Sequence, residues 1–172
     1  MKNYPLILVG LLMFSTTAFA LEKTSPEPID EVHQRMQQVV PFTLDQARQT
    51  FTKTVHGGVQ HIVAKSAGDT RQIKLIQAHL LEISNQFRKG DFSVTERMHG
   101  SDMPGLAQLK TAKTDDIKFE YKALENGAQI HYSTEYPQFV QALHEWFGAQ
   151  ISEHGSDVLP PEHSQHHLTP AE

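Results

Sequence analysis

Apolar residues recur at helical spacing in the middle of the chain. They are separated by 3, 4, 3 and 4 positions and comprise Ile73, Ile76, Leu80, Ile83 and Phe87. Residues at these intervals share one face of an α-helix. Asp69 followed by Gln72 has the pattern of a capping box, and Gly90 is of the residue type that often ends helices. The pattern therefore predicts an amphipathic helix between Asp69 and Gly90.

Farther along, apolar and polar positions alternate on both sides of Asn126-Gly127. The apolar set is Ile117, Phe119, Tyr121 and Ala123 before the turn, and Ala128, Ile130, Tyr132 and Thr134 after it. This alternation with an Asn-Gly pair predicts a β-hairpin with a type I′ turn. Counting outward from the turn places Tyr121 opposite Tyr132 on the buried face and Lys122 opposite His131 on the other face.

Three further elements flank these two. Thr43 begins a capping-box pattern, which predicts a helix from about Leu44 to Lys53. Val55 to Lys65 is rich in Val and Ile, which predicts a strand, and Gly57-Gly58 suggests a bulge near its start. A final helix is expected to begin at Pro137 and to end at His154-Gly155.

The order strand, helix, strand, strand, helix is typical of an α+β sandwich of the ferredoxin-like type or of a truncated form that lacks the last strand. Both long helices should cover one sheet face, and a weakly patterned extra helix over Glu31 to Val39 would precede them. The long connection from Asp91 to Asp116, with a short helix over Leu106 to Lys110, is of a length that often carries function.

The N-terminus has the features of a cleavable secretory signal peptide. Lys2 precedes an apolar run from Pro5 to Phe14, and Ala18-Phe19-Ala20 matches a signal peptidase site. The run is too short to span a membrane, which needs roughly 20 apolar residues. The mature chain should start at Leu21 and be periplasmic or secreted, without a membrane anchor.

Domain organisation follows from these segments. Residues 1–20 are the expected signal peptide, and residues 21–41 a linker or weak helix. Residues 42–156 should form a single α+β domain. Residues 157–172 should be a disordered tail with His163, His166 and His167.

Charge and cysteine content exclude several partners. Without the signal peptide the chain keeps 14 basic and 20 acidic side chains, and these basic residues are not clustered. Nucleic acids and anionic lipids are bound by clusters of Lys and Arg, so neither is an expected partner. The chain has no cysteine. Disulfides, thiolate chemistry and Cys-ligated metals are therefore excluded.

Eleven histidines suggest a metal site. Imidazole is the commonest metal ligand, and imidazole combined with thioether suits copper before zinc. The candidate ligands are His56, His61, His99, Met103 and His154, with Asp102 and His144 as additional candidates.

Structural roles compete with this interpretation. His144 and His79 each lie at the border of an apolar helix stripe, where a hydrogen-bonded, partly buried histidine is commoner than a ligand. His56 and His61 point to opposite faces of a regular strand. They could share an ion only if a bulge at Gly57-Gly58 rotated one of them.

Three stretches carry a resemblance to a known family. They are His56-Gly57-Gly58-Val59-Gln60-His61, His99-Gly100-Ser101-Asp102-Met103-Pro104-Gly105, and the segment from His144-Glu145-Trp146-Phe147 to His154-Gly155. The region from Phe42 to Gly155 resembles small exported bacterial proteins of unestablished function, which often carry the label aspartate carbamoyltransferase. The resemblance implies that the three stretches belong to one fold, which favours a shared site.

The residues do not support the activity named in that label. Carbamoyltransferases resemble a longer two-domain α/β enzyme with an S-T-R-T-R loop and an H-P-x-Q motif, and neither string occurs here. Nucleophile-elbow, phosphate-loop and dinucleotide patterns are missing as well. His99, Ser101 and Asp102 are too close in sequence to indicate a catalytic set, and Asp102 is equally explained as a helix cap. The sequence thus favours a binding protein over an enzyme.

Two function classes follow. The first is a periplasmic transition-metal binding protein, which should take up stoichiometric copper or zinc without residues 157–172. The second is a periplasmic module that binds a small ligand or an envelope protein through the open sheet face or the long connection. In that second class the histidines are structural, and replacing His56 and His99 should change stability but not partner capture.

Overall fold

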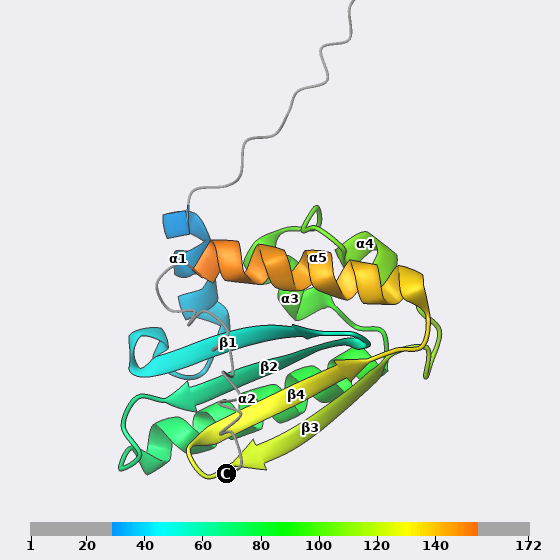
Figure 1. Cartoon of the computed structure of the whole chain (residues 1–172). Coiled ribbons are helices and arrows are strands. Elements are labelled where there is room, and N and C mark those ends of the chain that lie inside the picture. Colours follow the sequence, from blue (N-terminus) through cyan, green and yellow to red (C-terminus); the bar gives the residue numbers. More distant parts are fainter. Residues whose placement is uncertain (1–28, 155–172) are drawn as a thin grey trace, which may run out of the picture.

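A four-stranded antiparallel sheet forms one layer of the protein (Figure 1). The computed structural model describes residues 29–154. The strands are β1 (Ala47–Thr54), β2 (Gly57–Ala64), β3 (Lys118–Leu124) and β4 (Gly127–Ser133), in the spatial order β1-β2-β4-β3. Two hairpins therefore meet where β2 pairs with β4.

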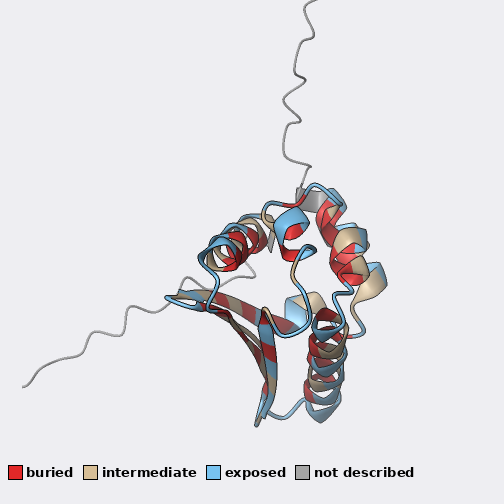
Figure 2. Ribbon diagram, turned by 90° about the vertical axis from the view of Figure 1, so that its right-hand side faces the viewer, coloured by how far each residue is buried: buried red, intermediate tan, exposed pale blue. Residues whose placement is uncertain are grey.

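Helices cover one face of this sheet. Helix α2 (Thr70–Arg88) packs on β3 and β4, and α5 (Pro137–His154) packs on β1 and β2. Three shorter helices complete the layer: α1 (Ile29–Val39), α3 (Ser93–His99) and α4 (Leu106–Leu109). Figure 2 shows these helices together on one side of the curved sheet. Within residues 29–154, the opposite face carries no helix.

The expected fold class is confirmed. The architecture is an α+β sandwich compatible with the ferredoxin-like type, and its two long helices lie on one sheet face. Asp69 caps α2 as expected, because its Oδ1 accepts a hydrogen bond from the Gln72 backbone N–H at 3.0 Å. The weak N-terminal helix is present as α1, and α3 is an additional helix inside the long connection.

The predicted helix from Leu44 to Lys53 is wrong, because this segment contains strand β1 after one 3-10 turn at Leu44–Gln46. The Thr43 side chain makes no capping bond. Instead, the Gln72 side chain accepts from the Thr43 backbone N–H at 3.1 Å and donates to its carbonyl at 2.6 Å. Ala47, Gln49 and Phe51 are buried at alternate positions, which is the period of a strand.

The expected bulge at Gly57-Gly58 is also absent, since β2 pairs in continuous register with both of its neighbours. The chain instead turns at Val55 and His56. Glycine is required at position 58 because a Cβ there would lie 2.1 Å from a ring carbon of Phe147 on α5. Its role is to admit this close aromatic contact.

The β3–β4 hairpin has the expected faces but a different register. Tyr121 lies opposite Ile130, Tyr132 opposite Phe119 and His131 opposite Glu120. The predicted pairs are thus shifted by two residues, which leaves each side chain on its predicted face. Asn126 and Gly127 both have negative φ, so the turn is not type I′. A Cβ on Gly127 would meet the Ile62 carbonyl oxygen at 2.1 Å, so this glycine allows β2 to approach.

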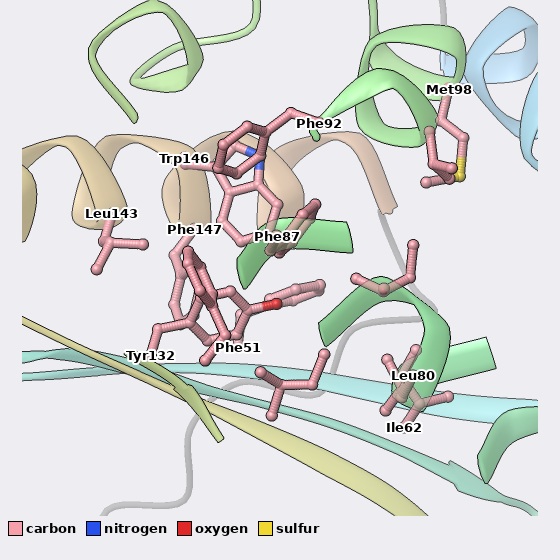
Figure 3. Packing of buried hydrophobic residues seen from close by; sticks show 14 of the residues in the cluster. Phe51, Ile62, Leu80, Phe87, Phe92, Met98, Tyr132, Leu143, Trp146 and Phe147 are labelled. Carbon is pink, nitrogen blue, oxygen red and sulfur yellow. The ribbon is translucent and has the colours of Figure 1, made fainter. Parts of the chain in front are cut away.

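Aromatic side chains fill the space between the sheet and the helices (Figure 3). Tyr132 on β4 lies at the centre, with ring centroids 5.2 Å from Phe147 and 5.5 Å from Trp146. Burial raises the pKa of Tyr132, and its hydroxyl donates to Gln60 Oε1 at 2.7 Å. This aromatic cluster fixes α5 above the sheet.

Candidate functional site

The structure places the candidate ligands at separate positions. His56 is exposed in the β1–β2 turn, and His61 lies on the helix-free sheet face, where its Nε2 contacts Gln129 Oε1 at 2.9 Å. Met103 is buried and Asp102 is exposed. His154 is the last residue of α5, and its side chain lies outside the described residues. Among the described residues, no group of three or more His, Asp or Glu side chains is arranged to hold a metal ion.

His99 connects two helices. It is buried at the end of α3, and its Nδ1 lies 2.5 Å from Glu153 Oε2 on α5. Next to it, the Met98 carbonyl oxygen accepts a hydrogen bond from Arg35 Nε on α1 at 2.9 Å. His99 thus attaches α3 to α5, and Arg35 attaches α1 to α3.

His144 and His79 both have the half-buried positions expected of them. His144 Nε2 donates to the Thr54 carbonyl oxygen at 2.9 Å and so attaches α5 to the end of β1. His79 packs its ring edge-on against Phe42, with centroids 5.6 Å apart. Burial lowers the pKa of His79 to about 4, opposed by nearby Glu82. At neutral pH His79 is therefore uncharged.

An open groove lies between the tip of the β1–β2 hairpin and the first turns of α5. Its volume is about 620 Å³, and one end of α5, the β4–α5 loop and the hairpin tip each contribute walls. The groove residues used below are Lys53, Val55, His56, Glu135, Pro137, Val140, His144, Glu145 and Gly148. Val55 is 84% exposed, an unusual position for a valine. The sequence singled out His56 and His144 but did not indicate that they line one groove.

The groove is apolar along its floor and charged at its edges. Val55, Pro137 and Val140 supply the apolar surface. A Cβ on Gly148 would lie 3.5 Å from Lys53 Nζ, so the ammonium group lies directly over this glycine. The groove therefore offers a binding surface with both apolar and charged parts.

A second, smaller cavity lies between the helices and the sheet. It has a volume of about 40 Å³, and polar side chains make up much of its wall, among them Gln49, Gln60, Thr95, His99 and Gln150. Met36, Met98, His79 and Trp146 line it as well. Trp146 is 3% exposed, and its Nε1–H has no acceptor among the described residues. The sequence indicated Met103 as a thioether ligand, whereas the thioethers at this cavity belong to Met36 and Met98.

None of the helices within residues 29–154 is long and apolar enough to cross a membrane. The predicted signal peptide and the histidine-containing tail lie outside these residues. Comparisons of the chain with models of protein families, with curated proteins and with solved structures found no match.

Proposed function

We propose that the protein is an exported binding module whose ligand site is the groove between the β1–β2 hairpin tip and α5. The observation that carries the proposal is the groove itself, with a volume of about 620 Å³ and walls from three segments of the chain. Sites for small ligands are typically concave, mostly apolar and roughly 300 to 1,000 Å³ in volume, with a few polar groups that orient the ligand.

The walls favour an amphipathic ligand of about the size of a short peptide. Val55, Pro137 and Val140 would cover apolar groups, and Lys53 would bind a carboxylate. Glu135 and Glu145 would bind an amino group or peptide N–H groups. His56 adds an imidazole that can donate or accept a hydrogen bond.

Two of the predicted metal ligands have structural roles instead. This supports a binding module over a metal protein that uses the predicted ligand set. His144 is bonded to the Thr54 carbonyl oxygen, and His99 is paired with Glu153. Each contact joins one secondary-structure element to another. Replacing His99, which does not line the groove, should therefore reduce stability before it affects ligand capture.

The groove can be tested by NMR titration of ¹⁵N-labelled protein with a library of hydrophobic tetrapeptides that have free termini. We expect amide shifts confined to residues that line the groove. Val140→Glu places a charge on the apolar floor and should abolish binding. The matched control, Val63→Glu, changes the helix-free sheet face and should leave binding unchanged. Shifts on that face, or no shifts at millimolar peptide, would refute the groove as the site.

A further inference from the structure

We propose that the small cavity beneath α1 and α3 is a copper(I) site, with the thioethers of Met36 and Met98 and the imidazole of His79 as ligands. This site is separate from the groove and does not depend on it.

Three helices bring these side chains to one cavity. Met36 comes from α1, Met98 from α3 and His79 from α2, and all three line the same space of about 40 Å³. Met36 is 2% and Met98 9% exposed, so the thioethers are shielded from bulk water. Figure 3 shows Met98 reaching from α3 into the region above Leu80 of α2. A cavity needs only about 10 to 15 Å³ to admit a water molecule, so there is room for a small ion.

The chemistry of the ligands selects the ion. Thioether sulfur is a soft ligand that favours Cu(I), and imidazole binds copper well. A monovalent ion also costs less to bury than Zn²⁺. In a chain without cysteine, methionine and histidine are the soft ligands available.

One buried polar group at the wall of the cavity has no protein partner. Trp146 is buried, and its Nε1–H has no acceptor among the described residues. Buried donors without a partner are rare, and this N–H would donate to a water molecule in the cavity. Such a water could coexist with a metal ion held by the thioethers and the imidazole that line the same cavity.

Neighbouring contacts position the ligands. The Arg35 bond to the Met98 carbonyl connects the helices that carry the two methionines. The contact between His99 Nδ1 and Glu153 Oε2 attaches the end of α3 to α5. We assign His99 this positioning role and not that of a ligand. Loss of such supporting contacts typically lowers metal affinity 10-fold to roughly 100-fold.

Methionine methyl NMR tests the site directly. Besides Met1 and Met13 in the predicted signal peptide, the chain has Met36, Met98 and Met103. Mature protein labelled with ¹³C at the methionine methyl groups is titrated anaerobically with Cu(I), supplied as its acetonitrile complex. We expect the methyl signals of Met36 and Met98 to shift to saturation at one equivalent, and that of Met103 to stay unchanged. Met103 is a suitable internal control because it is also buried but lines neither cavity.

Affinity measurements with a Cu(I) chelator as competitor complete the test. The double variant M36L/M98L keeps side-chain volume and should lose roughly 100-fold or more in affinity, whereas M103L should not. Val140→Glu should leave Cu(I) binding intact, which separates this proposal from that of the groove. An unchanged affinity in M36L/M98L would overturn the assignment. So would Cu(I) binding that leaves the methyl signals of Met36 and Met98 unchanged, or no binding of Cu(I) at all. If the double variant does not fold, the methyl shifts of the unmodified protein decide.

Discussion

At the scale of single residues, His79 is the side chain whose ionisation is most clearly linked to the fold. Its pKa is about 4 in the folded protein against 6.5 for an unperturbed histidine, because burial disfavours the charged ring. Between these two values the unfolded chain binds the proton and the folded protein does not. Stability is therefore fully present above about pH 6.5 and is lost as the pH falls toward 4.

We expect this loss to reach about 3 kcal/mol at most, the free energy that corresponds to the pKa difference. Urea denaturation at a series of pH values measures it. His79→Gln should have a shallower dependence than the unmodified protein, and the control His131→Gln, on the helix-free sheet face, should keep the original one. Equal slopes for His79→Gln and the unmodified protein would show that His79 is charged inside the fold.

At the scale of elements, polar side chains of α2 attach this helix to the edge strand β3. Ser84 Oγ and Arg88 Nε both donate to the Phe119 carbonyl oxygen, at 3.0 and 2.9 Å. Gln77 Nε2 donates to the Leu124 carbonyl oxygen at 2.9 Å. The helix therefore occupies carbonyl groups of a strand at the sheet edge, which limits pairing of that edge with another chain.

Ser84→Ala should destabilise the protein by about 1 kcal/mol, the usual net contribution of one hydrogen bond. The Phe119 carbonyl keeps Arg88 as a partner, so the effect should not extend to local unfolding of β3. Chemical denaturation measures the change, and the exposed Ser66→Ala serves as control. A loss no larger than that of Ser66→Ala would mean that Arg88 alone satisfies this carbonyl.

Elements with a strong local pattern were predictable. The apolar stripe of α2, the alternation in β3 and β4, and Pro137 at the start of α5 each express the geometry of one element. β1 was not predictable, because Phe51 is its one large buried apolar residue and the capping pattern at Thr43 suggested a helix. Pairing with β2 and packing on α5 outweigh that local preference.

At the scale of the whole molecule, export remains a prediction from the N-terminal sequence. Expression of the full chain in a Gram-negative host should yield periplasmic protein whose mass corresponds to a start at Leu21. Replacing Ala20 by Arg should block cleavage, because signal peptidase requires a small residue there. Protein that keeps Met1 and stays in the cytoplasm would contradict the prediction.

The fold of the whole molecule also decides which of the possible ligands lie close together. His56 and His144 are 88 positions apart in the chain and line one groove, and Met36, His79 and Met98 from three helices line one cavity. His61 is five residues from His56, yet it lies on the helix-free sheet face. Distance along the chain therefore says little about which of these side chains meet.

Local sequence pattern was enough to establish the α+β class, the two long helices and the side-chain faces of the second hairpin, because helix and strand periodicity arise from neighbouring residues. The pairing of β1, the roles of Gly58 and Gly127 and the composition of both cavities emerged from the folded chain. These features depend on contacts between segments far apart in sequence. The periodicity of side chains within one segment does not show which other segments it contacts.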